Sequence, residues 1–551
     1  MPPVQMKDHD KAVTAIANKI STFHRNKQQW KVYHGSTSST RVQNFSRNAI
    51  IDTSSLNHIL SISNSSMTAL VEPNVSMEKL VEATLAQGLL PPVVMEFPAI
   101  TVGGGFSGTS AESSSFKHGL FEETIRSIEI VLADGEVMKA SETENQELLH
   151  AAAGAFGTVG VVTMLEVALI EAKPYVELEY LPVQSMNDAI ETMEQAMKSG
   201  THQYVDAIMY SATSGVVMIG NLVSTPSTTS PASLAQFHRA RDPLFYQHVE
   251  RILHAHNSPG SQRSQTQTQT QPHPPPNLIP IQSYLFRYDR GAFWGAKWAF
   301  AYFLTPLNSL TTFLLNPFLK TNTMYAALHK SGLAEQFIVQ DCVFPADRAE
   351  EFVAYCGHRL GFWPMWLCPL NFARGVMGHG VHPKLFDFAD ADEDGEGKSG
   401  GSRTKRKWLC NVGIWGPGPK KHEEFVQLNR EIEGKVKELG GVKTLYAHTY
   451  YTEEEFDAIY DRKRYDMLRT KYHAEGLPSV YEKVRVDVTK RRKVVSGIKA
   501  VWPLGGLYGV LCVLLGSDYL MVSDGSFFTP SRVVVAILVA ATAILCTRVV
   551  Q

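Results

Sequence analysis

The most constraining feature of the chain is a segment rich in glycine and hydroxyl residues, Thr101–Gly119, which reads TVGGGFSGTSAESSSFKHG. Four glycines lie close together in it, at Gly103, Gly104, Gly105 and Gly108. Glycine permits positive φ angles and lets the backbone approach a ligand with no Cβ atom in the way. Free N–H groups in such a turn, together with Ser and Thr hydroxyls, form a concave anion site. The segment therefore predicts a turn that cradles a phosphate or diphosphate, with an ordinary glycine-rich surface loop as the alternative.

The residues in and around this segment indicate which kind of phosphate-binding site it can form. It fits neither the P-loop pattern nor the GxGxxG that opens a Rossmann βαβ unit. It is followed by an apolar strand pattern within Thr124–Lys139, in which Asp134-Gly135 is a hairpin signal. A helical run over Thr143–Ala153 then precedes a second glycine segment, Gly154–Val162, and an apolar strand that reaches Ile170.

Elements on either side of this region are also predicted from the pattern. Residues Ser76–Leu90 are predicted to form a helix with Ser76 as its N-cap. Tyr175–Pro182 and Tyr204–Asn221 are predicted to be strands of the second domain.

Ten short motifs support a resemblance to a known family over about residues 30–485. They are TVGGxxxGT (101–109), ESSSxKxGLF (112–121), ExVLADG (129–135), GTxG (157–160), AKxYVxL (172–178), VQD (339–341), PxWLCP (364–369), VHP (381–383), LYA (445–447) and EEF (454–456). The chain resembles the PCMH-type FAD-binding superfamily of vanillyl-alcohol oxidase and p-cresol methylhydroxylase. Within that superfamily it is similar to the Δ24-sterol reductase family.

The resemblance implies an α+β fold with FAD bound non-covalently between two domains. The expected divisions are a two-subdomain FAD-binding domain over residues 10–172, a substrate-capping domain over 173–489, and a C-terminal membrane anchor over 490–551. The cofactor-binding residues that it implies are Thr101, Val102, Gly103, Gly104, Gly105, Phe106, Ser107, Gly108, Thr109, Ser110, Ala111, Glu112, Ser113, Gly157, Thr158 and Gly160. The loop Tyr33–Arg41 stands where this superfamily makes its first diphosphate contact, and a plain turn is the alternative. His34 within it is interpreted as a surface histidine and not as a covalent flavin ligand.

The family reduces the side-chain C24=C25 double bond of a sterol with NADPH, which implies that activity on a CH–CH bond here. An isolated alkene must receive a proton as well as a hydride, so the site needs a positioned acid. The candidates are Tyr446, which matches the LYA motif, His448 beside it, and Lys117, which is also a possible phosphate or flavin-edge cation. For each of these a structural hydrogen bond is the alternative.

Two insertions and one aromatic tract stand out in the predicted cap. Residues 258–276 and 389–407 are low-complexity or strongly charged segments and are predicted to be disordered. Between them lies a tract with eight aromatic residues, and a leucine-rich run that ends at Leu319 follows it. The aromatic residues are Phe286, Tyr288, Phe293, Trp294, Trp298, Phe300, Tyr302 and Phe303. The tract predicts either a buried helix pair or an apolar wall that lines a substrate tunnel or dips into a bilayer.

The bulk composition excludes several classes of protein. Lys and Arg total 52 against 54 Asp and Glu, so nothing global indicates nucleic-acid binding. The six cysteines show no CxxC spacing, which argues against structural disulfides or zinc. The His-rich segment Val249–His256 has no partner cluster, so no metal is predicted. No apolar signal-peptide segment follows the polar N-terminus.

The C-terminal tail is different in kind from the rest of the chain. A basic cluster, Lys490–Lys493, precedes two uncharged stretches, residues 500–517 and 533–547. Together these stretches predict a membrane hairpin, or one span plus an interfacial segment, with two core helices as the alternative. The basic cluster favours keeping that side of the membrane cytosolic. The expected location is the endoplasmic reticulum membrane, with the catalytic domains facing the cytosol.

Three functions remain open at this point. The first is an FAD- and NADPH-dependent reductase of a sterol or related terpenoid. The second is an oxidase of the same superfamily that uses O₂ on a hydroxylated small molecule. The third is a non-enzymatic sterol-binding protein.

Overall fold

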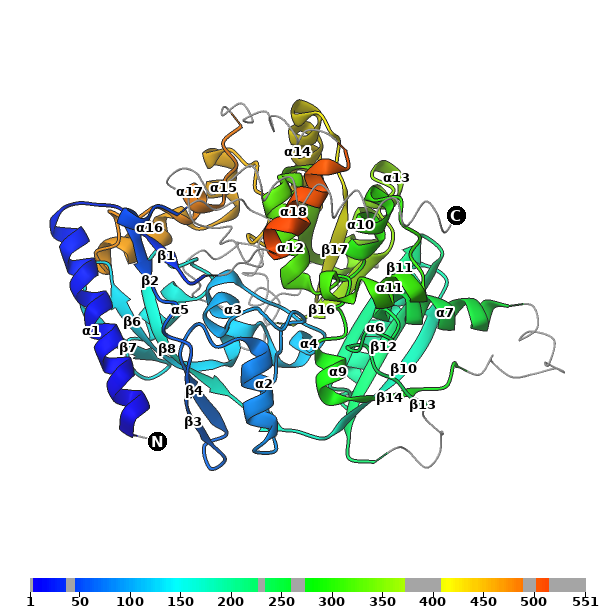
Figure 1. The fold of residues 1–551 in the computed structure, drawn as a ribbon, viewed down its shortest axis with the longest axis horizontal. Helices are drawn as coiled ribbons and strands as arrows, with labels where there is room; N and C mark the ends of the chain where they lie inside the picture. The colour runs from blue at the N-terminus through cyan, green and yellow to red at the C-terminus, as the bar shows by residue number, and fades with distance from the viewer. Residues whose placement is uncertain are drawn as a thin grey trace, which may run out of the picture.

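Two β-sheets dominate the molecule and carry helices on their outer sides (Figure 1). The computed structural model describes residues 3–35, 45–225, 233–258, 273–371, 408–488 and 502–514. Both of the insertions predicted at 258–276 and 389–407 fall largely or wholly outside these residues, as does the uncharged stretch 533–547. Two further pairs of short strands complete the β-structure of the described ranges.

The N-terminal sheet has five strands in the order β3-β4-β8-β6-β7, and all of its pairs are antiparallel. Its strands are β3 (Ile59–Ser63), β4 (Thr68–Val71), β6 (Ile125–Leu132), β7 (Val137–Ser141) and β8 (Gly160–Ala168). The hairpin predicted at Asp134-Gly135 is confirmed: it joins β6 to β7, and Gly135 has a φ of +99°. A side chain at Gly135 would also collide with Ser21 of the N-terminal helix.

Helices and short strands surround this sheet. They are α1 (Pro3–Arg25), η1 (Arg47–Ala49), α2 (Met77–Leu85), α5 (Gln146–Ala152), the parallel pair β1 (Lys31–Tyr33) and β2 (Ile50–Asp52), and the antiparallel pair β5 (Leu89–Leu90) and β9 (Ile170–Glu171). The predicted N-cap of α2 is confirmed, because the Ser76 hydroxyl accepts a hydrogen bond from the Lys79 N–H at 3.2 Å. The helix ends at Leu85 and not at the predicted Leu90, since Gly88 turns with a φ of +72° and leads into β5.

The glycine segment is a short helix and not the predicted turn. Residues of the segment form α3 (Val102–Gly108) and α4 (Ser115–His118), and η2 (Phe121–Thr124) follows directly after it. The left-handed conformation belongs to Thr109, at a φ of +59°, and to none of the four glycines of α3. Close packing explains two of these glycines. A Cβ atom at Gly103 would lie 2.6 Å from Pro73, and one at Gly105 would lie 2.3 Å from Met95.

The second sheet has nine strands in the order β13-β14-β10-β12-β11-β16-β17-β15-β18, and only β13 and β14 pair in parallel. Its strands are β10 (Tyr175–Val183), β11 (Tyr204–Ser211), β12 (Ser214–Val223), β13 (Ser233–Leu234), β14 (Asn277–Pro280), β15 (Phe337–Pro345), β16 (Met365–Leu370), β17 (Leu409–Pro417) and β18 (Val442–Lys443). The strands predicted over Tyr175–Pro182 and Tyr204–Asn221 are present, the latter as the hairpin of β11 and β12.

Helices α6 (Met186–Lys198), α13 (Ala346–Arg359) and α14 (His422–Glu438) cover one face of this sheet. Alternate side chains of β15, at 338, 342 and 344, join their core, while 339 and 343 join the core on the opposite face. Successive side chains on a strand point to opposite faces, so this sheet has a helix-covered face and a face directed toward the N-terminal domain. Asp341 belongs to the second face.

The aromatic tract forms much of the core on that second face. It lies in α10 (Gly295–Tyr302) and in the segment that joins this helix to α9 (Ile281–Leu285), near α7 (Phe245–Asn257). Phe293 stacks on Tyr288 and on Trp415 of β17, with ring centroids 4.1 Å apart in both pairs. The buried-core interpretation is therefore correct for the first half of the tract. After Phe303, the chain continues through α11 (Ser309–Leu314), η3 (Asn316–Phe318), α12 (Thr321–Ser331) and η4 (Leu333–Gln336).

The segment after β18 returns to the N-terminal domain. Helices α15 (Glu453–Ile459), α16 (Arg462–Lys471) and α17 (Val480–Val484) lie above β1 and α5 in Figure 1. The Tyr465 hydroxyl donates to Thr158 Oγ1 at 2.7 Å, and the Lys483 ammonium donates to the Phe156 carbonyl. This segment therefore holds the second glycine segment in place.

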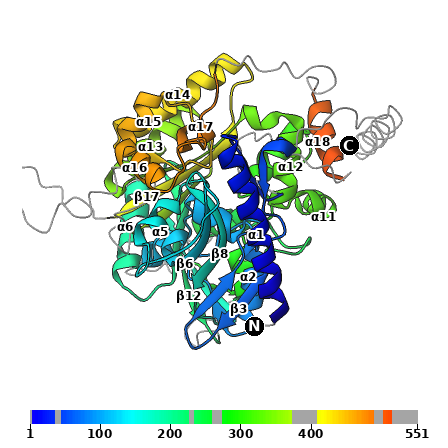
Figure 2. The same cartoon turned by 90° about the vertical axis from the view of Figure 1, so that its left-hand side faces the viewer.

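The described part of the chain contains no helix that is both long and apolar enough to cross a bilayer. The predicted stretch 500–517 contributes α18 (Leu504–Leu514), which packs against α12 and does not stand alone (Figure 2). Its glycines make this packing close, since a Cβ atom at Gly509 would lie 2.3 Å from the Ala327 carbonyl oxygen. The membrane hairpin predicted from the sequence therefore has no support in these residues.

Buried His9 ties α1 to the N-terminal sheet. Its Nδ1 lies 2.8 Å from Glu72 Oε1, and its Nε2 lies 3.1 Å from Glu129 Oε1. The other oxygen of Glu72 accepts from His58 Nδ1 at 2.8 Å. Burial alone lowers the pKa of His9, but the hydrogen bonds and charges of the two carboxylates outweigh it and raise the pKa to about 9.

We expect His9→Ala to lower the free energy of unfolding at pH 6 by about 3 kcal/mol, because it removes one partner from a buried ion pair. The folded-state pKa of about 9 exceeds the ordinary 6.5. The stabilisation is thus complete below pH 6.5 and is lost as the pH rises through 9. Urea titrations across this range should show the decline in the wild type and not in His9→Ala. His24→Ala, at an exposed position of the same helix, is the control, and an unchanged pH dependence in His9→Ala would contradict the expectation.

Candidate active site between the two sheets

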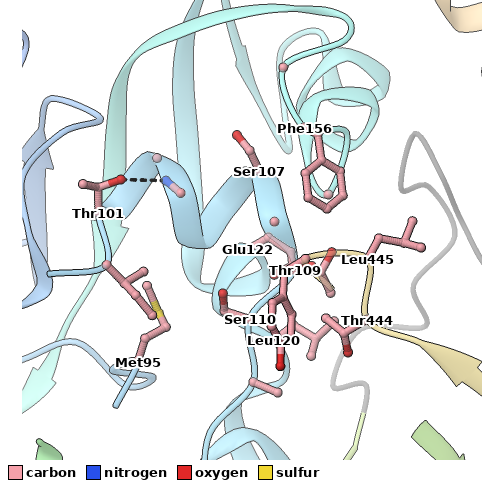
Figure 3. A pocket seen from close by; sticks show the side chains of 18 of the residues that line it. Met95, Thr101, Ser107, Thr109, Ser110, Leu120, Glu122, Phe156, Thr444 and Leu445 are labelled. Carbon is pink, nitrogen blue, oxygen red and sulfur yellow. Dashed lines mark hydrogen bonds between the residues drawn. The ribbon is translucent and has the colours of Figure 1, made fainter. Parts of the chain in front are cut away.

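A cavity of about 400 Å³ lies between the glycine segments of the N-terminal domain and the second sheet. Figure 3 shows the part of its wall that comes from α3, the loop after it and the segment 444–445. The side chains of Ser107, Thr109 and Ser110 lie along it, and those of Phe156 and Leu445 lie next to them in this view. Loops and helix ends thus supply one wall and strands supply the other.

The first wall is built on α3. Thr101 caps this helix, because its Oγ1 accepts the Gly104 N–H at 3.1 Å (Figure 3). The Gly103 N–H donates to the Pro73 carbonyl at 2.8 Å, which fixes the start of the helix. A Cβ atom at Gly108 would meet nothing within 4 Å. The backbone at Gly108 is therefore open toward the cavity.

The structure brings the two predicted glycine segments together. The Gly154 N–H donates to the Phe106 carbonyl, and the Phe156 N–H donates to the Ser107 carbonyl, both at 3.0 Å. Phe156 and Gly157 have φ angles of +51° and +67°, so this segment makes the left-handed turn that was predicted for the first one. Lys483 also lines the cavity, so its ammonium group and the hydroxyl groups of Ser107 and Thr109 belong to the same cavity lining.

Two carboxyl groups of the N-terminal domain also line the cavity. Burial raises the pKa of Glu122 to about 8, and the neighbouring Glu123 carboxylate adds to the effect. Burial also raises the pKa of Glu96, and the Glu112 charge raises it further. With a pKa of about 8, Glu122 is mostly protonated at neutral pH and can donate a hydrogen bond into the cavity.

The opposite wall carries a hydrogen-bonded acid and phenol. The Tyr446 hydroxyl donates to Asp341 Oδ2 at 2.6 Å, and the Asn411 amide donates to Asp341 Oδ1 at 2.9 Å. Burial raises the pKa of Asp341, although these two hydrogen bonds oppose the shift. Burial raises the pKa of Tyr446 as well, and the Asp341 charge raises it further. Around the pair the wall is apolar and aromatic, with Trp366 and Trp415 of the second sheet.

Most of the residues predicted to bind a cofactor lie together in this wall. Those that line the cavity are Thr101, Gly103, Gly104, Ser107, Gly108, Thr109, Ser110, Ala111, Gly157 and Gly160. Behind them, Val102, Gly105 and Phe106 pack in the core. Thr158 is buried and donates to the Ala155 carbonyl at 2.7 Å.

Glu112 and Ser113 lie deeper, outside the cavity lining. Glu112 Oε2 accepts the Ser113 N–H and hydroxyl at 2.7 and 2.9 Å, and it lies 3.9 Å from buried Arg287 of the cap. These residues join the two domains.

The three predicted catalytic residues are separated. Tyr446 lines the cavity, whereas Lys117 and His448 do not. Lys117 is exposed, and its ammonium is 3.4 Å from the His202 carbonyl. His448 is buried, and its carbonyl accepts from the Lys443 ammonium at 2.6 Å.

Sequence reasoning missed several cavity residues. His34, interpreted as a surface histidine, is partly exposed and also lines the cavity, and burial lowers its pKa. Asp341 lies within the VQD motif, and its alternation with Val339 and Val343 on one strand was the available signal. Glu96 and Glu122 carry no sequence pattern of their own. Among the described residues no group of three His, Cys, Asp or Glu side chains could hold a metal ion.

Comparisons with known proteins identify the kind of site. Residues 11–141 match the FAD binding domain family. The Delta(24)-sterol reductase of Macaca fascicularis is 27% identical over 415 residues, which are 75% of this chain and 73% of that protein. The Delta(24)-sterol reductase of Arabidopsis thaliana is 27% identical over 448 residues, 77% of this chain and 74% of its own. The Delta(24)-sterol reductase homolog of Caenorhabditis elegans is 25% identical over 481 residues, which are 84% of this chain and 84% of that protein.

The cavity fits the cofactor that this family binds. A dinucleotide needs close backbone approach and hydroxyl donors around its diphosphate, which Gly108, Ser107, Thr109 and Ser110 provide. The Lys483 ammonium adds positive charge beside the second glycine segment. The resemblance found in the motifs is confirmed: the chain contains an FAD-binding domain and is an FAD-dependent oxidoreductase related to the Delta(24)-sterol reductases.

Proposed function

We propose that this protein reduces the side-chain C24=C25 double bond of a sterol or a related terpenoid, with NADPH as the source of hydride. The observation that carries the proposal is the Asp341–Tyr446 pair, which faces the cavity from the wall opposite the glycine segments. An oxidase that removes hydride from an alcohol needs a base at this place, whereas an alkene reductase needs an acid. A buried carboxyl with a raised pKa, paired to a phenol, suits the second role.

Reduction of the alkene adds one hydride and one proton. Bound FAD, once reduced, supplies the hydride. The proton goes to the less substituted carbon, because the more substituted carbon better bears the developing positive charge. Tyr446 passes its hydroxyl proton to the alkene carbon, and its oxygen then takes a proton from solvent by way of Asp341, the carboxyl group to which the hydroxyl donates. Asp341 is left as the carboxylate that accepts from Tyr446 and Asn411, as the hydrogen bonds show.

The cavity wall around this pair suits a sterol tail. Phe97, Tyr325, Leu370, Trp366 and Trp415 line it, and apolar burial must provide most of the binding energy for such a ligand. NADPH and the sterol would then use the same cavity in turn. The rings of the aromatic tract do not line it, and Phe293 lies behind Trp415 as a second layer.

A membrane location also belongs to this proposal. Sterols reside in bilayers, and the uncharged residues 533–547 follow the basic cluster Lys490–Lys493. We propose that the protein acts at the endoplasmic reticulum membrane with its catalytic domains in the cytosol.

Anaerobic flavin spectroscopy tests the function. NADPH should bleach the ~450 nm flavin band, a wavelength typical of the cofactor, and a Δ24-sterol should restore it with formation of the saturated side chain. A sterol that is saturated at C24 is the matched control and should leave the flavin reduced. Rapid aerobic turnover with peroxide release and no need for NADPH would instead support an oxidase.

We expect Gly108→Leu to fold normally but to lose FAD. Leucine is a good helix former, and a Cβ atom at this position would point into open space, so the side chain projects into the cavity. The measurement is the ratio of flavin absorbance to protein absorbance after reconstitution. Gly434→Leu, on α14 and equally open, should retain FAD, and a Gly108→Leu protein with full flavin would contradict the assigned cradle.

We expect Tyr446→Phe to slow the sterol-dependent reoxidation of flavin by about 10²- to 10⁴-fold, the usual contribution of a positioned acid. FAD content and the rate of flavin reduction by NADPH should stay near wild type. Asp341→Asn should slow the same step and flatten its pH profile, since an amide cannot supply the proton. Tyr472→Phe, outside the cavity lining, is the control. Equal losses in both half-reactions would indicate a structural role for the pair.

A further inference from the structure

One face of the cap exposes a cluster of large apolar side chains. Leu310, Phe313 and Leu314 of α11 are 64%, 52% and 64% exposed, and Leu304 before the helix is 73% exposed. Positions i, i+3 and i+4 share one side of a helix, so the three residues of α11 point the same way. Trp502 is 52% exposed, and its indole N–H donates to the Tyr302 carbonyl at 2.7 Å. These five residues form what we name the apolar face.

The charge pattern around the apolar face is unusual for a solvated surface. Residues 298–319 contain no Asp, Glu, Lys or Arg. Lys297 and Lys320 flank the stretch, and Lys297 lies 5.0 Å from the Trp298 ring centre. Phe, Leu and Trp bordered by lysine are typical of segments that lie in a membrane interface, because lysine pairs with lipid phosphates.

Helix α18 connects the apolar face to the C-terminal tail. A Cβ atom at Gly506 would lie 2.6 Å from the Tyr302 ring, so α18 sits directly against the chain that leads to α11. Figures 1 and 2 place α11, α12 and α18 on the same side of the molecule. The described part of α18 reaches Leu514, which is 64% exposed. The uncharged stretch 533–547 follows this helix in the sequence.

We propose that the apolar face rests on a phospholipid bilayer, with the side chains of α11 and Trp502 at the acyl-chain boundary. Helix α12 is then the wall between lipid and cavity: α18 packs on it at Ala327, and Tyr325 of the same helix lines the cavity. The proposal rests on the membrane location proposed above and names the surface that makes the contact, and docking is measured without flavin chemistry or turnover.

Depth-dependent quenching tests the docking in the full-length chain. Phe313→Cys and, separately, Leu310→Cys are made in a Cys546→Ser background and labelled with an environment-sensitive fluorophore. The described native cysteines are buried, and the unsubstituted background measures their labelling. Met467→Cys is the matched control, since Met467 is 57% exposed on α16, on the opposite side of the molecule in Figure 2. The labelled proteins are floated with phosphatidylcholine and phosphatidylserine vesicles whose acyl chains are brominated.

We expect both probes on α11 to be quenched several-fold more than the probe at position 467. Equal quenching at 313 and 467 in protein that floats with the vesicles would overturn the proposal, because the tail alone would then hold the protein. Failure of the protein to float would overturn it as well. A blue shift at 313 without vesicles that grows with protein concentration would show that a second copy of the chain covers the face, and not lipid. None of these outcomes depends on sterol reduction, so they are separate from a failure of the proposed function.

Discussion

A buried charge cluster between the two domains fixes the geometry on which the site depends. Arg287 donates to Asp206 at 2.9 Å and lies 3.9 Å from Glu112, while the Trp366 indole N–H also donates to Asp206, at 3.0 Å. Buried charges are costly unless paired, and one guanidinium faces two carboxyls. Burial raises the pKa of Glu112, although the Arg287 charge opposes this shift. Because Glu112 follows the glycine helix and Trp366 lines the cavity, pairing them through Asp206 and Arg287 sets the two cavity walls at one spacing.

The same cluster explains where sequence reasoning succeeded and where it failed. Residues 101–113 were predicted as one ligand-binding segment, and most of those from 101 to 111 do share one wall. Glu112 and Ser113 continue the pattern in sequence but turn away from the cavity, because their partners are Tyr284 and Arg287 of the cap. The glycines were predicted to form a left-handed turn, yet two of them are needed for contact with Pro73 and Met95. Glycine content alone does not distinguish positive φ from close packing, since both need a missing Cβ atom.

Contacts between residues far apart in the sequence were the second feature that sequence reasoning did not predict. Tyr446 was predicted from its motif, but its Asp341 partner lies 105 positions away, and only the alignment of β15 beside the 442–446 segment brings the two together. His448 was predicted to be catalytic because it lies two residues after Tyr446 in the sequence. In the structure it is buried, and its carbonyl accepts a hydrogen bond from Lys443. Local elements were easier: the Asp134-Gly135 hairpin and the Ser76 cap each depend on neighbouring residues alone.

The nine-stranded sheet separates two environments, an apolar core under its helices on one face and the polar part of the cavity wall on the other. On β15 and β17, alternate residues such as Cys342 and Val412 pack under α13 and α14, while Asp341 and Asn411 beside them face the cavity. An acid on such a strand is held rigidly because each neighbouring residue is anchored in the opposite core. A polar pair on a loop would need water or further side chains to keep one geometry. The rigid sheet thus keeps Asp341 desolvated, and that desolvation is the physical source of its raised pKa and of its capacity to hold a proton for the alkene.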